Sequence, residues 1–200
     1  MTTDDQTHRD KMRSLQKAQD EKRRQLRDPD RGLIIINTGD GKGKSSSAFG
    51  VIARALGWGH RVAVVQFIKG KWQTGEKQFF ARFADQVSWH VMGDGFTWNT
   101  QDRSADTESA QAALNRAGEL IASGEYQLVV LDEINIALRY QYLTPDEVIA
   151  VLERRAATSV LLTGRDAPQE LIDIADTVTE MRAVKHAYQD NIRAQQGIDF

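Results

Sequence analysis

Residues 33–45 read Leu33-Ile34-Ile35-Ile36-Asn37-Thr38-Gly39-Asp40-Gly41-Lys42-Gly43-Lys44-Ser45, and this segment predicts the architecture of the chain. Its first four residues are apolar and mostly β-branched, which is typical of a strand buried on both faces of a parallel sheet. A glycine-rich turn follows, and Gly43-Lys44-Ser45 opens a stretch with helical composition. A strand, a glycine-rich turn and a helix beginning with Gly-Lys-Ser form the context of a phosphate-binding loop, or P-loop.

The glycine-rich turn predicts a site for a nucleotide triphosphate. Glycine lets successive backbone N–H groups point at phosphate oxygens, and the helix N-terminus adds partial positive charge. We expect Lys44 to reach the outer phosphates and the Ser45 hydroxyl to bind Mg²⁺. The match is incomplete, because Thr38 stands where the usual pattern begins with glycine. The predicted nucleotide-binding residues of the loop are Thr38, Gly39, Asp40, Gly41, Lys42, Gly43, Lys44, Ser45 and Ser46.

Further apolar runs alternate with helical stretches along the rest of the chain. The expected strands are 33–36, 62–65, 128–131, 159–163 and 177–179, with 87–92 as a weaker candidate. The expected helices are 45–56, 76–83, 107–122, 145–154 and 168–175. Thr144-Pro145-Asp146-Glu147 has the residues of a helix start: an N-cap, proline in the first turn, and acids. This alternation predicts an α/β domain of three layers around a mostly parallel sheet.

The segment Leu128-Val129-Val130-Leu131-Asp132-Glu133 supports the nucleotide site. An apolar strand that ends in carboxylates is the Walker-B form, which places an acid beside the P-loop to hold Mg²⁺. The spacing leaves open whether Asp132 or Glu133 binds the metal directly. A helix N-cap followed by an acid of the first turn is the alternative interpretation.

Composition excludes several other classes. The chain has 200 residues, no cysteine and a formal net charge of −2. It is long enough to bury a core without disulfides, and it offers no thiol nucleophile or cysteine metal site. Because basic residues are not in excess, nucleic-acid binding is not expected, and the apolar runs are too short to predict a membrane span or a signal peptide. We therefore expect a cytoplasmic protein.

The first 31 residues differ from the remainder. They are rich in lysine, arginine and aspartate and have few apolar side chains, which predicts a flexible or helical N-terminal arm. The expected division is an arm over 1–31 and a P-loop domain over 32–200.

The motifs of the P-loop domain identify a P-loop enzyme but not its reaction, since kinases and ATPases share them. In a kinase or ATPase, Glu133 would activate water or an acceptor, with Arg103, Arg165 or Arg182 as candidate arginine fingers. A nucleotide-dependent interaction module is a third alternative.

Several segments resemble the P-loop-type corrinoid adenosyltransferase family, in order from about residue 31 to the C-terminus. The resembling segments are 38–50, Val64-Val65-Gln66-Phe67-Ile68-Lys69-Gly70, Gly95-Phe96-Thr97-Trp98-Asn99-Thr100-Gln101, 129–133, Leu162-Thr163-Gly164-Arg165, Val184-Lys185-His186-Ala187, and the end through Gly197-Ile198-Asp199-Phe200. Two departures are visible. Ser45-Ser46 stands where the family usually has two threonines, and Asp40 stands where asparagine is common.

The resemblance implies a RecA-like fold, a homodimer, and transfer of the 5′-deoxyadenosyl group of ATP to the Co(I) of a reduced corrinoid with release of triphosphate. It also implies that ATP binds in the reverse of the usual P-loop orientation. Under it, Lys44, Phe96 and Trp98 are the catalytic residues, the two aromatic side chains forming an apolar wall below the corrinoid ring. Arg165 is expected on a phosphate, and Ser45, Asp132 and Glu133 around Mg²⁺ or Mn²⁺. The expected partners are ATP, a corrinoid, and an electron-donor protein such as a reduced flavoprotein.

Overall fold

The computed structural model describes residues 3–68, 74–92 and 103–199, and its contacts divide the chain into two compact units, Met1–Asp30 and Arg31–Phe200. The first unit contains a single long helix, α1 (Thr3–Gln25). Its side chains from Asp5 onward are exposed to solvent. Ion pairs one turn apart, Asp20–Arg23 and Glu21–Arg24, lie on its surface at 4.0 and 3.8 Å. The expected helical arm is therefore a continuous helix.

The second unit is built on one six-stranded sheet among the described residues. Its strands are β1 (Ile34–Thr38), β2 (Val62–Gln66), β3 (Val87–Val91), β4 (Leu128–Asp132), β5 (Ser159–Thr163) and β6 (Thr177–Glu180). They lie in the order β3-β2-β4-β5-β1-β6, and every neighbouring pair is parallel. One strand, β5, separates the P-loop strand β1 from β4, which carries the two carboxylates. All carboxyl ends of the strands therefore meet at one edge.

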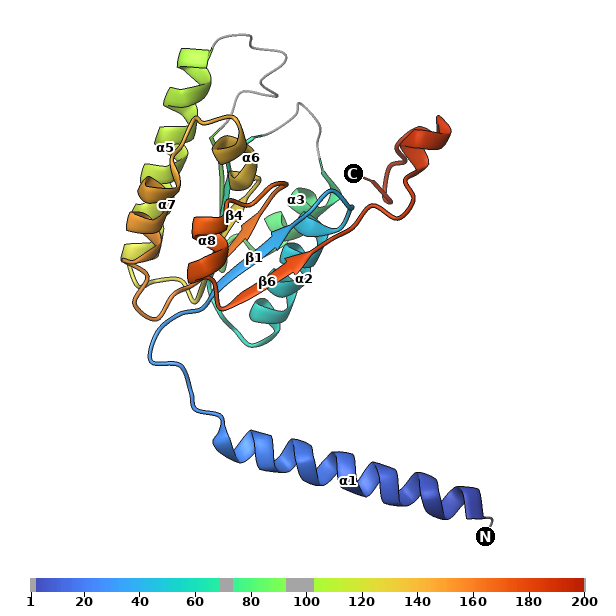
Figure 1. Ribbon diagram of the computed structural model, residues 1–200. Coiled ribbons are helices and arrows are strands. Elements are labelled where there is room, and N and C mark those ends of the chain that lie inside the picture. Colours follow the sequence, from blue (N-terminus) through green and yellow to red (C-terminus); the bar gives the residue numbers. More distant parts are fainter. Residues whose placement is uncertain (1–2, 69–73, 93–102, 200) are drawn as a thin grey trace. The chain divides into compact units, whose positions relative to one another are not determined.

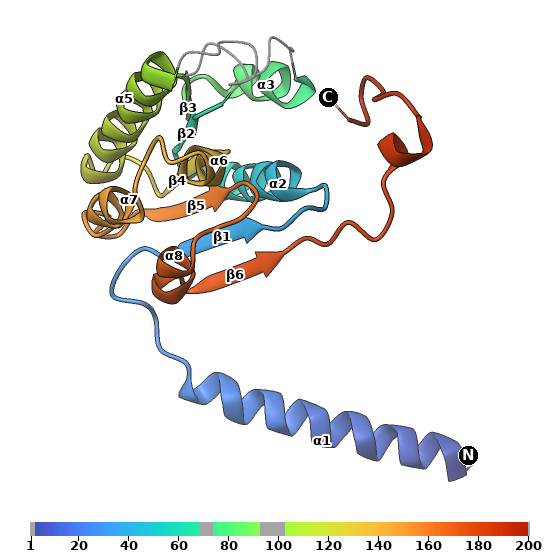
Figure 2. The ribbon, with the colours of Figure 1, turned by 45° about the horizontal axis from the view of Figure 1, so that its top comes forward.

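Helices cover both faces of this sheet (Figure 2). They are α2 (Lys44–Gly57), α3 (Gly75–Phe80), α5 (Arg103–Ala122), α6 (Ile134–Arg139), α7 (Pro145–Leu152) and α8 (Gln169–Ile174), with short 3₁₀ turns at Ala81–Phe83 and Ala187–Asp190. None of the described helices is both long and apolar enough to cross a membrane.

Two hydrophobic cores lie on opposite faces of the sheet, which makes three layers. One core joins side chains of the central strands to α5, α6, α7 and α8. The other joins the alternate side chains of the strands, such as Val64 and Val130, to Ala48, Phe49 and Ile52 of α2. Because a central strand alternates between two buried faces, its sequence is a continuous apolar run rather than an alternating one. The α/β, RecA-like domain with a mostly parallel sheet is therefore confirmed.

Two local features differ from the expectation. Helix α6 is absent from the expected helices, because its residues Ile134 and Ile136 are β-branched and come almost directly after the apolar strand β4. Strand β6 was expected to be buried on both faces, yet all four of its residues are exposed, at one of the two edges of the sheet. The predicted helix start at Thr144 is present: its hydroxyl accepts from the Glu147 N–H at 3.3 Å, and the Glu147 carboxylate accepts from the Thr144 N–H at 2.8 Å.

Candidate active site

A cavity of about 430 Å³ opens where the P-loop meets the carboxyl ends of the strands. It is lined by Asp40, Gly41, Lys42, Gly43, Lys44, Ser45, Ser46, Ile68, Glu133, Ile136, Arg139, Tyr140, Arg165 and Asp199. Three stretches of the chain contribute most of it: the P-loop, the residues at and around α6, and Arg165 in the turn that follows β5. The cavity is thus built by elements that the sheet topology brings to one edge.

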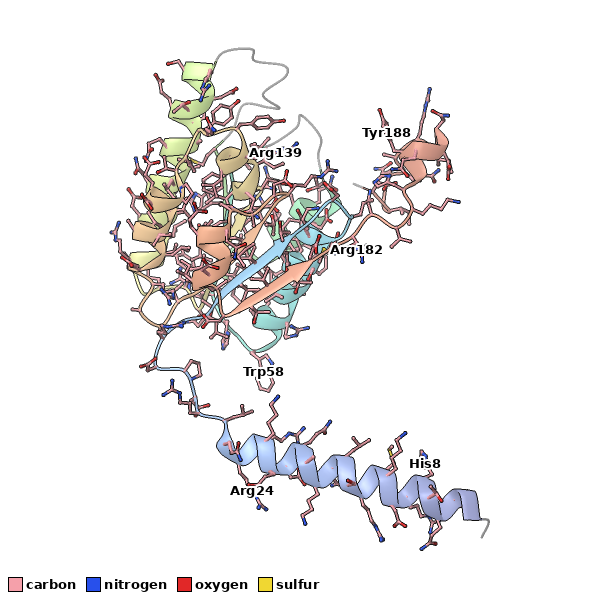
Figure 3. All side chains as sticks on the ribbon, in the orientation of Figure 1. His8, Arg24, Trp58, Arg139, Arg182 and Tyr188 are labelled. Carbon is pink, nitrogen blue, oxygen red and sulfur yellow. The ribbon has the colours of Figure 1, made fainter. Side chains whose placement is uncertain are left out.

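The residues that follow β6 stabilise the P-loop through backbone hydrogen bonds. The Gly41 N–H donates to the Met181 carbonyl at 2.6 Å, and the Met181 N–H donates to the Thr38 carbonyl at 2.8 Å. A Cβ at Gly39, which has a φ of +92°, would lie 2.5 Å from the Met181 carbonyl oxygen, and one at Gly41 would lie 2.7 Å from backbone atoms of Arg182. Figure 3 labels Arg182 on this segment just after β6. Glycine is therefore required at both positions by a close approach of backbone.

Lys44 is the first residue of α2, and its side chain folds back over the P-loop. Its ammonium donates to the carbonyls of Gly39 and Gly41, both at 2.7 Å. Burial lowers the pKa of Lys44, and the nearby carboxylate of Glu133 partly opposes this shift. A buried ammonium surrounded by backbone oxygens is held in one orientation, which prepares it to bind anionic oxygen atoms in the cavity.

Asp132 belongs to a buried chain of hydrogen bonds along the carboxyl edge of the sheet. Trp89 Nε1 donates to Gln66 Oε1 at 2.9 Å, and Gln66 Nε2 donates to Asp132 Oδ2 at 3.0 Å. The Thr163 hydroxyl donates to Asp132 Oδ1 at 2.8 Å and accepts from the Glu133 N–H at 2.9 Å. Both oxygens of Asp132 are therefore engaged by neighbouring strands, and Asp132 does not line the cavity.

Glu133 follows Asp132 but faces the cavity. Its φ of +63° turns the chain away from the strand direction, and α6 begins at the next residue. Its Oε2 atom is buried without a hydrogen-bond partner in the described part of the chain. Burial, and secondarily Asp132, raise the pKa of Glu133 to about 7, while Lys44 and Arg165 act in the opposite direction. A buried carboxylate oxygen that lacks a donor, in a residue that lines the same cavity as Ser45, suits a hard cation such as Mg²⁺.

Further charged groups surround the mouth of the cavity. Arg165 follows β5 and Gly164, and its side chain lies 3.9 Å from the Asp40 carboxylate. This exposed ion pair gives the acid at position 40 a positively charged neighbour. Arg139 pairs with Asp166 at 3.0 Å, and Figure 3 labels Arg139 on α6. Lys42 donates to the carboxylate of Asp199.

The structure brings most of the expected site residues together. Of the expected nucleotide-binding residues, Asp40 through Ser46 and Arg165 line the cavity. Thr38 and Gly39 do not; the Thr38 hydroxyl accepts from the Ala167 N–H at 3.1 Å instead. Phe96 and Trp98 lie outside the described residues.

Sequence reasoning assigned no role to five residues that line the cavity: Ile68, Ile136, Arg139, Tyr140 and Asp199. Ile136 and Arg139 belong to α6 and Tyr140 directly follows it, and these three residues are absent from the expected site because that helix was not predicted. Asp199 was part of a resembling segment, and in the structure it contacts Lys42, 157 residues away, at the edge of the cavity.

The chain is similar to proteins of a known family. The family model of the ATP:corrinoid adenosyltransferase BtuR/CobO/CobP matches residues 30–200. A corrinoid adenosyltransferase of Pseudomonas aeruginosa is 53% identical over 197 residues, covering 98% of this chain and 97% of the relative. The corrinoid adenosyltransferase CobA of Salmonella typhimurium is 45% identical over 172 residues, covering 86% of this chain and 87% of the relative.

A solved structure supports the fold alone. The flagellar accessory protein FlaH from Methanocaldococcus jannaschii superposes with a TM-score of 0.50 at 15% identity, covering 74% of this chain and 70% of that one. At this identity the likeness concerns the arrangement of sheet and helices and carries no information on chemistry.

Proposed function

The chain belongs to the ATP:corrinoid adenosyltransferase family, and we propose that it transfers the 5′-deoxyadenosyl group of ATP to the Co(I) of a corrinoid and releases inorganic triphosphate. The observation that supports this proposal is a cavity at the P-loop that is lined by three basic residues, Lys42, Lys44 and Arg165. Three cations around a glycine-rich loop suit a leaving group with several negative charges.

In the proposed step, the electron pair of Co(I) attacks the C5′ carbon of ATP. A cobalt–carbon bond forms while the C5′–O bond breaks, and the bonding electrons leave with the triphosphate. The nucleophile comes with the corrinoid substrate, so the protein needs no nucleophilic side chain. Its main task is to hold C5′ in line with cobalt and to stabilise the charge on the departing oxygen.

Lys44 is the residue best placed to stabilise the leaving group. Its ammonium already contacts two loop carbonyls in the buried part of the loop, so little reorganisation is needed when phosphate oxygens arrive. Lys42 and Arg165 line the same cavity and add charge at its mouth. A hydrogen bond to such a charged group contributes about 1.5–3 kcal/mol.

Ser45 and Glu133 are the residues proposed to hold Mg²⁺ or Mn²⁺. Bound there, the metal would neutralise part of the triphosphate charge. We assign Asp132 a positioning role, since Gln66 and Thr163 engage both of its oxygens. Through the Thr163 hydroxyl, Asp132 fixes the backbone of Glu133 in the conformation that directs its carboxylate into the cavity.

Family resemblance carries the rest of the proposal. Phe96 and Trp98 form the apolar wall that keeps a lower ligand off the cobalt and eases reduction of Co(II) by an electron-donor protein such as a reduced flavoprotein. The enzyme acts as a cytoplasmic homodimer, with the N-terminal arm over residues 1–31 and the catalytic domain over 32–200.

A product analysis tests the proposal. The protein is incubated with Mg-ATP and chemically reduced corrinoid, and the products are followed by absorbance and chromatography. We expect a light-sensitive cobalt–carbon product together with inorganic triphosphate in equal amounts. ADP formed without consumption of corrinoid would instead identify a kinase or ATPase in which Glu133, with its raised pKa, activates water. No turnover of either substrate would favour an interaction module.

Replacing Lys44 tests the role of the loop in the same assay. Lys44→Ala should lower the rate by about 100-fold or more, as removal of a donor to a developing anion does in other enzymes. Lys77→Ala on α3 is the matched control, since Lys77 does not line the cavity, and it should keep the activity of the parent chain. Activity retained by Lys44→Ala would contradict the assignment.

The aromatic wall has its own test. Phe96→Ala and Trp98→Ala should slow the reaction most when it starts from Co(II), because only then must the lower ligand be removed. Starting from Co(I), the same variants should stay closer to the parent enzyme. Equal rates for the parent and both variants from Co(II) would show that the wall hypothesis is wrong.

A further inference from the structure

The C-terminal segment returns to the P-loop after β6 and places one carboxylate at the edge of the cavity. Asp199 lines the cavity together with Lys42, and the Lys42 ammonium donates to Asp199 Oδ1. The Asp199 side chain is 22% exposed, whereas the Lys42 side chain is 54% exposed. The hydrogen bond from Lys42 is the main reason why the pKa of Asp199 lies below its usual value, so the carboxylate is ionised at neutral pH.

A local turn fixes the position of this carboxylate. The Gln195 N–H donates to Asp199 Oδ2 at 2.8 Å, and the Asp199 N–H donates to the Gln195 carbonyl at 2.8 Å. Between them, Gly197 has a φ of +81°, which tightens the turn. Ile198 lies along an apolar groove with Phe49, Phe79 and Phe80. The carboxylate therefore has one oxygen held by its own turn and the other directed at Lys42.

We propose that Asp199 is a positioning residue for Lys42, and that its carboxylate competes with polyphosphate oxygens for the Lys42 ammonium. The inference rests on the proposed function, in which Lys42 contacts the triphosphate chain. Carboxylate and phosphate oxygens accept from an ammonium in the same way, so each can replace the other on Lys42. A polyphosphate on the P-loop also brings several negative charges close to Asp199, which raises the cost of keeping both anions at one lysine.

This competition has a consequence for product release. When the C5′–O bond breaks, the triphosphate gains an ionisable oxygen and becomes a stronger ligand for the loop than the triphosphate of ATP. Asp199 recaptures Lys42 as the product leaves, which lowers the affinity for free triphosphate. A residue at the end of the chain thereby limits inhibition by the product.

Binding of inorganic tripolyphosphate measures this competition without any corrinoid. The full chain and the variant Asp199→Asn are titrated by calorimetry in metal-free buffer. The asparagine oxygen can still accept from the Gln195 N–H, so the turn keeps its hydrogen bond. We expect Asp199→Asn to bind tripolyphosphate about fivefold more tightly, the size that loss of one exposed ion pair implies. Asp199→Glu keeps the charge and should return the affinity toward that of the parent chain.

Two further variants separate a specific contact from general electrostatics. Asp190→Asn removes the same charge from the same segment, but Asp190 pairs with Lys185 at 3.4 Å and does not line the cavity, so its affinity should stay within about twofold of the parent. Lys42→Met should weaken binding, and adding Asp199→Asn to it should then have no further effect, because the competitor acts through Lys42.

Four results of the tripolyphosphate titrations would overturn the proposal. The first two are unchanged or weaker binding by Asp199→Asn and an equal gain in affinity for Asp190→Asn. The others are full additivity of Asp199→Asn with Lys42→Met and a failure of the parent chain to bind tripolyphosphate. In turnover, Asp199→Asn should lower the KM for ATP and the inhibition constant of tripolyphosphate without raising kcat. Failure of adenosyl transfer itself would show separately, as ADP or no product, and would leave the binding result intact.

Discussion

At the residue scale, Asp132 and Glu133 are adjacent in sequence but differ in what their carboxylates contact. Asp132 accepts hydrogen bonds from Gln66 and Thr163 at 3.0 and 2.8 Å, and it is buried. Glu133 lines the cavity, and its buried Oε2 atom has no hydrogen-bond partner among the described residues. Consecutive residues of a strand point to opposite sides, and the φ of +63° at Glu133 adds a turn that sequence patterns do not show. We therefore propose Glu133, and not Asp132, as the direct metal ligand.

Metal binding provides the test of this difference. In the presence of ATP, Glu133→Gln should weaken binding of Mn²⁺ by about 100-fold, while Asp132→Asn should weaken it by about tenfold, as loss of an outer hydrogen-bond partner does. Electron paramagnetic resonance of the bound Mn²⁺ gives the affinities independently of turnover. Thr163→Ser, which keeps the hydroxyl between Asp132 and the Glu133 N–H, should resemble the parent chain. A larger loss for Asp132→Asn than for Glu133→Gln would reverse the two roles.

At the element scale, the P-loop depends on an edge strand that is otherwise poorly buried. Strand β6 is exposed, yet the residues after it brace the loop through Met181. The strand is anchored at its start by Asp176, which accepts from both terminal nitrogens of Arg31 and from the Ile34 N–H, all at 2.8 Å. These hydrogen bonds, above all those from Arg31, lower the pKa of Asp176 from 3.8 to about 2. The anchor therefore joins the starts of β6 and β1.

Asp176→Asn should destabilise the chain by about 1 kcal/mol at pH 7, a modest value because the pair is partly exposed. The folded pKa lies below the unfolded one, so the ionised group stabilises the protein above about pH 4, and this contribution is lost as the pH falls toward 2. Urea unfolding at several pH values should show the difference between parent and variant narrowing below pH 4. Asp173→Asn, at an acid outside this anchor, should show no such change. A constant difference across the range would contradict the anchor.

The elements also show how far sequence reasoning reaches. Continuous apolar runs identified the strands because central parallel strands are buried on both faces, and the glycine-rich turn identified the loop because its ligand requires backbone N–H groups. Helix α6 escaped because its β-branched residues Ile134 and Ile136 come almost directly after the apolar strand β4, with no proline or glycine to mark a helix start. The pairing of Lys42 with Asp199 escaped for another reason: it joins residues 157 positions apart through a turn, and local patterns hold no information on such contacts.

At the scale of the whole molecule, the two compact units differ in what stabilises them. Both hydrophobic cores consist of residues from Ile34 onward, so the unit Arg31–Phe200 has its own interior. Helix α1 exposes its side chains from Asp5 onward and shows surface ion pairs, which contribute little each. The free energy of unfolding should therefore come almost entirely from the second unit.

Deleting residues 1–30 tests this division. The shortened chain should unfold in one transition, with a thermal midpoint within about 2 °C of the full chain, because a change below 1 kcal/mol moves the midpoint of a domain of this size by no more than a few degrees. Far-ultraviolet circular dichroism should lose the helical signal of the 23 residues of α1 and nothing else. Calorimetry at matched concentrations, with light scattering to follow the oligomeric state, separates a stability effect from a change in association. A midpoint lowered by more than about 5 °C at unchanged oligomeric state would mean that the arm folds cooperatively with the domain. The boundary near residue 31 would then mark a change in amino-acid composition but not the limit of a cooperatively folding unit.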